Sequence, residues 1–326
     1  MTPPNFADIE DAARQIKGAA IHTPLLREDV LDRLTGGRVF VKAEPLQRTG
    51  SFKFRGAYNR ISRLNEGDRR RGVVAYSSGN HAQAVARAAS LAGTTAVIVM
   101  PSDAPKLKIE ATRGYGAEVI LYDRATEARE VIAERVQTER GAILVPPFED
   151  PFIIAGQGTA ALEAAEDLAA MGLKADVALS PTSGGGLTAG TVLAFQATSP
   201  GVRCYAVEPH AFDDYGRSLA TGVRETNPAT SGGLCDALLT PTPGELTFTI
   251  NQPRLAGAFS VTDEEVLYAM AFAFRWLKLV VEPGGVVALA AVLAGKLDLK
   301  DQVAVVIVSG GNVDPEVFAR ALTIPV

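Results

Sequence analysis

Short apolar segments alternate with helical patterns along nearly all of this 326-residue chain. Buried strands are predicted at residues 73–76, 95–100, 118–122, 142–145, 177–179, 204–207 and 303–308. Helices are predicted at residues 81–91, 106–113, 126–139, 159–171, 188–197, 263–276 and 286–294. Strands that alternate with helices are typical of parallel sheets covered by helices. The sequence therefore predicts an α/β protein, long enough for two lobes with a cleft between them.

One segment, residues 224–252, interrupts this alternation. It is rich in Pro, Gly and Thr, and it is longer than an ordinary connection. We therefore expect a functional loop or a cover over the active site here.

The composition excludes several classes of protein. Hydrophobic residues make up 47% of the chain and charged residues 21%, as in compact globular proteins. The net charge of −5 and the lack of a long basic run argue against a nucleic-acid partner. No segment approaches the roughly 18 uninterrupted apolar residues of a membrane span, and the start of the chain does not resemble a signal peptide. The spacing of Cys204 and Cys235 does not indicate structural disulfides, so we expect a cytoplasmic protein. The lack of an apolar span argues against a membrane partner.

Lys53 is the first candidate functional residue, because it lies between Phe52 and Phe54. Loss of hydration lowers the pKa of a lysine. The neutral amine is a nucleophile that forms a Schiff base with an aldehyde such as pyridoxal phosphate. For a lone lysine, an exposed position at the start of a helix is the commoner interpretation.

A glycine-rich loop follows the predicted strand 177–179 and precedes the predicted helix 188–197. Consecutive glycines let backbone N–H groups converge, and the start of a helix attracts anions, so this arrangement is typical of a phosphate site. A flexible turn is the alternative. The loop matches neither the P-loop nor the dinucleotide-binding pattern. It consists of Ser183, Gly184, Gly185, Gly186 and Leu187.

Two further polar turns follow predicted strands. Ser77, Ser78, Asn80 and His81 lie between strand 73–76 and a helix, where they can bind a carboxylate while Asn80 reaches a phenolic oxygen. An ordinary N-capping turn and a packed histidine would give the same residues. Ser309 follows strand 303–308, and its hydroxyl can bond to a ring nitrogen.

In this order, the motifs Ser-Phe-Lys-x-Arg-Gly-Ala, Ser-Ser-Gly-Asn-His, Ser-Gly-Gly-Gly-Leu and Ser-Gly-Gly-Asn resemble those of the fold-type II pyridoxal phosphate enzymes. The resemblance is to the branch that holds threonine/serine dehydratases and serine racemase, and it runs from about residue 21 to residue 312. It implies a two-lobed fold similar to the β-subunit of tryptophan synthase. A large cofactor-binding domain would comprise residues 1–65 and 153–326, and a small domain, residues 66–152, would close over the cleft.

The resemblance also implies the roles of individual residues. Lys53 would hold pyridoxal 5′-phosphate as a Schiff base, with Phe52 beside the ring and Asn80 at its 3′-oxygen. Residues 183–187 would hold the phosphate, and Ser309 would face the pyridine nitrogen. Ser77, Ser78, Asn80 and His81 would contact the substrate, and in the racemase branch the serine at position 78 is the acid/base on the opposite face.

A cation site and a homodimer are implied by the same resemblance. Racemase-like members bind a divalent cation through positions that fall on Glu208, the carbonyl of Phe212, and Asp214. Oxygen ligands suit Mg²⁺, Ca²⁺ or Mn²⁺. A solvated acidic turn at a helix start is the alternative.

The activity implied is β-elimination from L-threonine or L-serine, in which Lys53 removes the Cα proton and a 2-oxo acid and ammonia are released. Because Ser309 is neutral, it would favour elimination over transamination. Serine racemase or threo-3-hydroxyaspartate dehydratase of the same fold is the main alternative. Relatives have an Ala-Asp-Gly turn after the metal segment, whereas this chain has a different sequence there, which includes Cys235-Asp236. The identity of the substrate therefore cannot be inferred from these relatives.

Two remoter alternatives are a non-catalytic ligand-binding relative and a nucleotide-binding α/β protein without pyridoxal chemistry. An intact Lys53 argues against the first, and the second leaves Lys53 and Ser309 without a role. The chain ends shortly after Asn312, so we expect a catabolic-type enzyme without a C-terminal regulatory domain.

Overall fold

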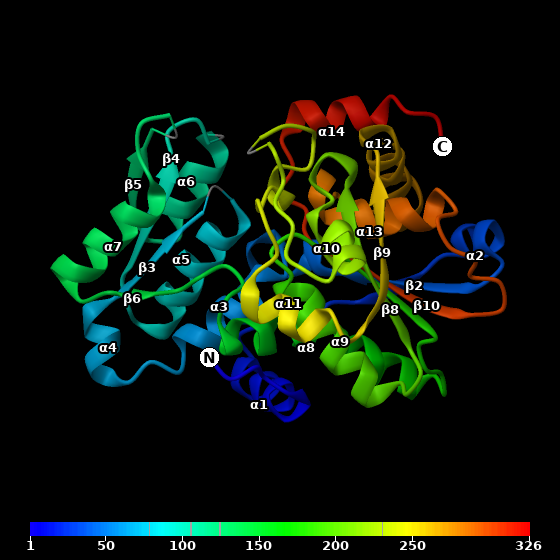
Figure 1. Ribbon diagram of the computed structural model, residues 1–326, viewed down its shortest axis with the longest axis horizontal. Coiled ribbons are helices and arrows are strands. Elements are labelled where there is room, and N and C mark those ends of the chain that lie inside the picture. The colour runs from blue at the N-terminus through cyan, green and yellow to red at the C-terminus, as the bar shows by residue number, and fades with distance from the viewer. Residues whose placement is uncertain (78, 105, 124, 230) are drawn as a thin grey trace.

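The computed structural model describes residues 1–77, 79–104, 106–123, 125–229 and 231–326, and its strands form two sheets (Figure 1). In spatial order, the large sheet consists of β1 (Leu25–Arg27), β2 (Arg38–Ala43), β10 (Val303–Val308), β7 (Val177–Pro181), β8 (Arg203–Pro209) and β9 (Leu255–Val261). The small sheet consists of β5 (Glu118–Tyr122), β4 (Ala96–Pro101), β3 (Val73–Tyr76) and β6 (Ile143–Leu144). Within these sheets neighbouring strands are parallel, except that β1 pairs antiparallel with β2. The prediction of an α/β fold with mostly parallel sheets is confirmed.

Helices connect the strands and cover both sheets. Up to the end of the small sheet they are α1 (Phe6–Ile16), α2 (Asp29–Thr35), α3 (Lys53–Ile61), α4 (Glu66–Arg71), α5 (Asn80–Ala92), α6 (Lys106–Gly114) and α7 (Arg129–Arg140). Beyond it they are α8 (Pro151–Ala170), α9 (Gly186–Thr198), α10 (Asp214–Thr221), α11 (Glu245–Asn251), α12 (Asp263–Phe272), α13 (Pro283–Leu293) and α14 (Pro315–Leu322).

Strand β10 lies in the middle of the large sheet and is buried on both faces. Ala304, Val306 and Val308 pack with residues of α12 and α13, whereas Val303 and Val305 pack with residues of α8 and α9. A strand covered on both faces needs apolar side chains at every position, which explains the unbroken apolar run.

The small sheet follows the same logic. Val73 and Ala75 of β3 face the cluster that includes α5, whereas Val74 faces the cluster that includes α7. Its four strands lie between residues 73 and 144, inside the predicted small domain of residues 66–152. The domain boundaries themselves stay a prediction.

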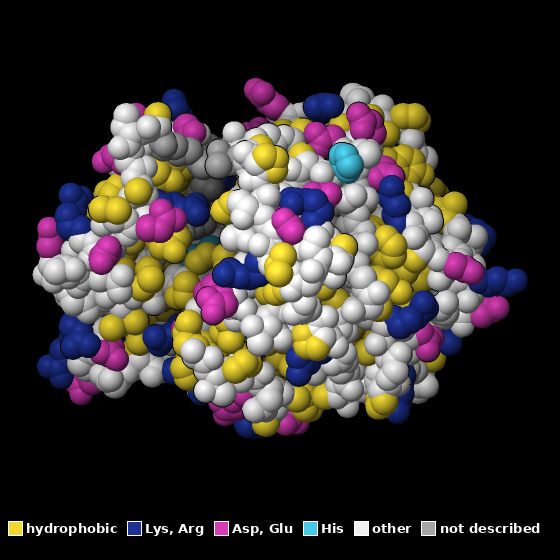
Figure 2. All heavy atoms as spheres, viewed as in Figure 1, with side chains coloured by type: hydrophobic (Ala, Val, Ile, Leu, Met, Phe, Trp, Pro, Cys, Tyr) yellow, Lys and Arg dark blue, Asp and Glu magenta, His cyan; other side chains and the backbone are white. Residues whose placement is uncertain are grey.

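Helix α3 joins the two lobes, because it packs against α5 of the small lobe and α8 of the large lobe. The molecular surface is hollowed where the lobes meet (Figure 2). Among the described residues, no helix combines the length and the apolar character that a membrane crossing requires.

Helix α8 begins at Pro151, eight residues before the predicted start at 159. Asp150 caps it by accepting the N–H groups of Phe152 and Ile153, at 2.8 and 3.0 Å. Much of this helix is buried, so its first turns lack the polar stripe that reveals a helix in a sequence.

The prediction of a loop at residues 224–252 is wrong for residues 245–251, because these residues form α11. The start of this helix is capped by Glu149, whose carboxylate oxygens accept the N–H groups of Leu246 and Thr247, at 3.1 and 3.3 Å. The capping residue is distant in sequence, so no local pattern announces the helix.

Candidate active site

Lys53 opens α3 at the point where the first part of the chain meets the end of β10. Ser51 forms an antiparallel bridge with Gly310, and the N–H of Phe52 donates to the carbonyl of Ser309 at 3.1 Å. The Lys53 ammonium lies 5.1 Å from the centre of the Phe52 ring. The backbone therefore brings the predicted lysine, Phe52 and Ser309 together.

Burial changes the chemistry of Lys53. Its Nζ donates to the carbonyl of Pro147 at 2.9 Å. Desolvation lowers the pKa of Lys53 from 10.5 to about 8. Near that pH a large share of the side chains carries a neutral amine, which is the nucleophilic form.

The glycine-rich loop runs from the end of β7 into α9. Gly185 is the N-cap of α9 and has a φ of +91°, and no side chain of the described residues caps this helix start. A Cβ on Gly185 would lie 2.3 Å from the hydroxyl oxygen of Tyr215. A helix start without a side-chain cap leaves backbone N–H groups for an anion, which fits the predicted phosphate site.

Hydrogen bonds from residues 240–251 hold the glycine-rich loop in place. Ser183 Oγ accepts the N–H of Thr240 at 3.1 Å. The carbonyl of Gly184 accepts the N–H of Gly244 at 3.2 Å, and that of Gly185 accepts Asn251 Nδ2 at 3.1 Å. Leu187 is buried. These carbonyls are directed toward the segment that contains α11, so the segment predicted as a loop supports the glycine-rich loop.

Phe148 connects the loop to Lys53. A Cβ on Gly184 would lie 2.4 Å from its ring, and the preceding residue, Pro147, accepts the Lys53 ammonium. Sequence reasoning did not single out these two residues. The signal that could have found them is their position shortly after the half-buried strand β6, at the end of a parallel strand where ligands bind.

The turn before α5 contributes the predicted substrate-binding residues. Ser77 Oγ accepts the N–H of Gly79 at 3.2 Å. His81 is buried, and its Nε2 lies 2.9 Å from the carbonyl of Val145. Burial, together with the charge of Lys53, lowers the pKa of His81 to about 3. His81 is therefore neutral, and Nε2–H donates to Val145. The predicted acid/base Ser78 lies outside the described residues.

Asn80 is held between two other side chains. Its Oδ1 accepts Asn312 Nδ2 at 2.8 Å, and its Nδ2 donates to Glu282 Oε1 at 2.5 Å. Glu282 is a further residue that the sequence did not indicate. It lies 202 positions from Asn80, so no local spacing could reveal the pair.

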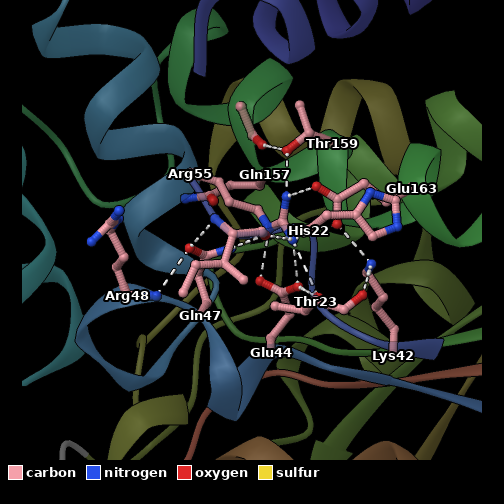
Figure 3. Close-up of polar contacts among 12 residues, drawn as sticks. His22, Thr23, Lys42, Glu44, Gln47, Arg48, Arg55, Gln157, Thr159 and Glu163 are labelled. Atoms are coloured by element: carbon pink, nitrogen blue, oxygen red, sulfur yellow. Dashed lines mark hydrogen bonds and ion pairs between the residues drawn. The ribbon is translucent and has the colours of Figure 1, made fainter. Parts of the chain in front are cut away.

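Beneath the start of α3 lies a buried charge cluster (Figure 3). Arg55 donates to both carboxylate oxygens of Glu44, each at 2.8 Å, and to Glu163 at 2.6 and 2.8 Å. Lys42 Nζ also donates to Glu163, at 2.7 Å. Burial opposes the charge of Arg55, but the two carboxylates outweigh it and raise the pKa of Arg55 above its usual value. The cluster fixes α3 to β2 and α8 through Arg55, which follows Lys53 by two positions in the chain.

The predicted cation ligands lie at the end of β8 and the start of α10. Glu208 accepts the N–H groups of Tyr215 and Gly216, both at 2.9 Å. Asp214 Oδ1 accepts Asn227 Nδ2, whereas the buried Asp214 Oδ2 has no hydrogen-bond partner among the residues that the structure describes. Burial and the charge of Asp214 raise the pKa of Glu208, and burial raises that of Asp214 to about 6.

Two close, buried carboxylates with an unpaired oxygen fit a cation, because a cation would relieve their repulsion. Within the part of the chain that is described, no group of three or more His, Cys, Asp or Glu side chains could hold a metal. A bound cation would therefore need backbone or water oxygens in addition, and the buried Phe212 lies in the short turn that precedes Asp214.

Known proteins resemble this chain over nearly its whole length. The family model described as pyridoxal-phosphate dependent enzyme matches residues 16–310. The chain is 44% identical to L-threo-3-hydroxyaspartate ammonia-lyase of Pseudomonas sp, over 98% of each chain. It is 42% identical to L-threonine ammonia-lyase of Thermotoga maritima, over 97% of this chain and 77% of that protein. The structure of maize serine racemase matches with a TM-score of 0.92 and 36% identity, over 99% of this chain and 98% of that one.

The helix start without a side-chain cap, the partly desolvated lysine and the Asn80 amide are all groups that a phosphorylated pyridine aldehyde would use. The predicted family is confirmed: this chain belongs to the fold-type II pyridoxal-phosphate dependent enzymes.

Proposed function

We propose that this enzyme is an ammonia-lyase that converts L-threonine or L-serine to a 2-oxo acid and ammonia. The observation that carries the proposal is the Lys53 amine, which has a lowered pKa and donates to the carbonyl of Pro147, next to the Phe148 that lies against Gly184 of the glycine-rich loop. The relatives named threonine and hydroxyaspartate ammonia-lyase support elimination as the reaction.

The residues fit pyridoxal 5′-phosphate in one orientation. Lys53 would bond to it and Phe52 would lie beside its ring. Residues 183–187 would hold the phosphate, with Asn80 at the 3′-oxygen and Ser309 at the ring nitrogen. When bound, the cofactor withdraws electrons from the Cα of the amino acid.

The protein would supply the proton transfers. Lys53 Nζ would take the Cα proton, and the carbonyl of Pro147 would keep the amine in place. The substrate carboxylate would bind at the start of α5, with Ser77, Asn80 and His81 around it; among the described residues, no side chain caps this helix start. Ser78 would be the acid/base on the opposite face. Because Ser309 carries no charge, it would leave the ring nitrogen unprotonated and favour loss of the β-hydroxyl.

L-threo-3-hydroxyaspartate is the second candidate substrate, and Lys108 is the observation that favours it. Gly79 lies in the turn before α5, and the Lys108 ammonium lies 3.7 Å from the position that a Cβ on Gly79 would take. It pairs with Asp236 of the large lobe at 2.6 Å. A second carboxylate on the substrate could take the place of Asp236 beside this cation.

Incubation with the three hydroxy amino acids tests these proposals. We expect 2-oxo acid from at least one of them. Lys108→Gln should raise the KM for hydroxyaspartate about tenfold more than the KM for L-threonine, because only the former has a distal carboxylate. If none of the three yields a 2-oxo acid, the ammonia-lyase proposal is rejected; D-serine as the main product would indicate the racemase alternative.

We further propose that Glu208, the Phe212 carbonyl and Asp214 bind a divalent cation, with Mg²⁺ first and Ca²⁺ or Mn²⁺ as alternatives. The unpaired oxygen of Asp214 supports this site. A cytoplasmic location and a homodimer stay predictions.

A further inference from the structure

Glu282 has a buried carboxyl group that its position in the fold does not explain. It is the N-cap of α13, but its side chain caps no N–H of that helix, and it is only 2% exposed. A Cβ on Gly310 would lie 2.0 Å from Glu282 Oε1. The carboxyl group therefore lies against the backbone that directly follows Ser309, at the edge of the candidate active site.

The amide of Asn80 is clamped by this carboxyl group. Asn312 Nδ2 donates both to Thr49 O, at 2.7 Å, and to Asn80 Oδ1, at 2.8 Å. The oxygen of the Asn80 amide is thus engaged, and one of its two N–H groups donates to Glu282. A primary amide has two donors, so one N–H of Asn80 remains.

The second oxygen of Glu282 is a buried acceptor to which no described residue donates a hydrogen bond. Buried polar atoms are almost always bonded, so such an atom calls for an explanation. The charged groups that act on Glu282 are Lys108 of α6, which attracts it, and Asp236 of the large lobe, which repels it. Burial raises the pKa of Glu282 to about 7.

We propose that Glu282 is a positioning residue that acts through Asn80. By accepting one N–H of the Asn80 amide while Asn312 holds its oxygen, Glu282 fixes the amide so that the other N–H faces the 3′-oxygen of the cofactor. Without Glu282 the amide can rotate, and its oxygen would then meet an oxygen of the ring. The inference rests on the cofactor placement proposed above and names a residue that controls it.

The test is the visible absorbance of the holoenzyme, which reports the proton shared between Lys53 Nζ and the 3′-oxygen. Glu282→Gln keeps the shape of the side chain and one neutral acceptor oxygen, but it removes the negative charge and replaces the other acceptor with a donor, so the bond from Asn80 becomes weaker. We expect the ratio of protonated to unprotonated cofactor at a fixed pH to change about threefold, equivalent to half a pKa unit. The Kd of the apoprotein for pyridoxal phosphate should rise about tenfold.

A double-mutant cycle distinguishes positioning from general support of the fold. In an Asn80→Ala background, Glu282→Gln should change neither quantity further, because the group through which it acts is gone. Glu265→Gln, an amide substitution at the start of α12, should leave spectrum and Kd at wild-type values. If Glu282→Gln does not fold, Glu282→Asp, which withdraws the carboxyl group, should show the same spectral change.

The proposal is overturned if Glu282→Gln has the wild-type spectrum and Kd, even if its melting temperature falls, or if its effects are the same with and without Asn80. A wild-type protein with no visible band would overturn the cofactor placement as well. A band without any 2-oxo acid would reject only the proposed substrates.

Discussion

Among single residues, burial decides which nucleophile is ready to react. Burial raises the pKa of the Cys204 thiol to about 12 and that of Cys235 further, so both stay protonated. The same effect lowers the pKa of Lys53 to about 8, because its charged form is the protonated one. The low-dielectric interior thus keeps the thiols protonated and unreactive, and it favours the neutral, nucleophilic form of the amine.

The pH dependence of cofactor capture follows from this shift. The neutral amine predominates above the pKa of Lys53, so the rate at which apoprotein binds pyridoxal phosphate should rise with pH and level off above about pH 8. Stopped-flow absorbance between about pH 6.5 and 9.5 measures it. A rate that still climbs steeply above pH 9.5 would show an ordinary solvated lysine, and Lys53→Ala should give no band.

A single added methyl group should disable the phosphate site. Gly185→Ala puts a Cβ 2.3 Å from Tyr215 Oη at a φ of +91°. We expect the affinity for pyridoxal phosphate to fall at least about tenfold. Gly201→Ala is the matched control, because its φ is +88° but a Cβ there meets nothing within 4 Å. Equal losses in both variants would attribute the effect to backbone strain alone.

Among the secondary-structure elements, α3 depends on charges that lie beneath it. Arg55 and Glu44 are both 0% exposed, and Glu163 ties the pair to α8. Such a cluster adds little net stability compared with an apolar core, but it is costly to break. The bonds of the cluster hold the helix that begins with Lys53 in one position.

Arg55→Met should therefore lower the free energy of unfolding by about 3–5 kcal/mol, because it leaves the buried carboxylate of Glu44 and the partly buried one of Glu163 without their shared partner. Urea denaturation measures this loss. Arg140→Met breaks an exposed pair with Glu118, where both side chains are about half exposed, and should cost less than about 1 kcal/mol. Similar losses in the two variants would contradict the role of the cluster.

At the scale of the whole molecule, the predicted cation site lies where a ligand would add to global stability. If Mg²⁺ binds the proposed site at Glu208 and Asp214 only in the folded chain, it would stabilise the fold by about 2.7 kcal/mol at 100 times its Kd. We expect differential scanning calorimetry to show a rise in Tm with Mg²⁺ that a chelator reverses. Asp214→Asn should abolish the rise, whereas an equal rise in that variant would place the ion elsewhere.

Much of this architecture could be predicted from the sequence because its signals are local. The predicted strands 73–76 and 303–308 coincide with β3 and β10, since a buried strand shows its apolar run directly. The predicted strand 118–122 coincides with β5, although only Tyr122 of that strand is buried. The glycine-rich loop lies between β7 and α9, as its sequence context indicates. Local motifs also placed Lys53 and Ser309 on segments that the fold brings together.

The supporting residues could not be predicted, because each acts on a partner far away in sequence. Glu149 caps α11 from 97 positions away, and Glu282 bonds to Asn80 across 202. A single buried carboxylate has the same appearance in a sequence as an exposed one. Only the fold shows that these acidic side chains point inward and which N–H groups they accept.

The place of β10 has a consequence for how the protein is made. This strand separates β2 from β7 and brings in Ser309, Gly310 and Asn312, which bond to residues 49–52 and to Asn80. On the ribosome it emerges after every other strand. The small sheet, encoded by one continuous stretch, can form early, but the large sheet stays split in two until the last strand arrives. A nascent chain therefore carries Lys53 and the phosphate loop without a finished site, and cofactor capture belongs to the completed polypeptide.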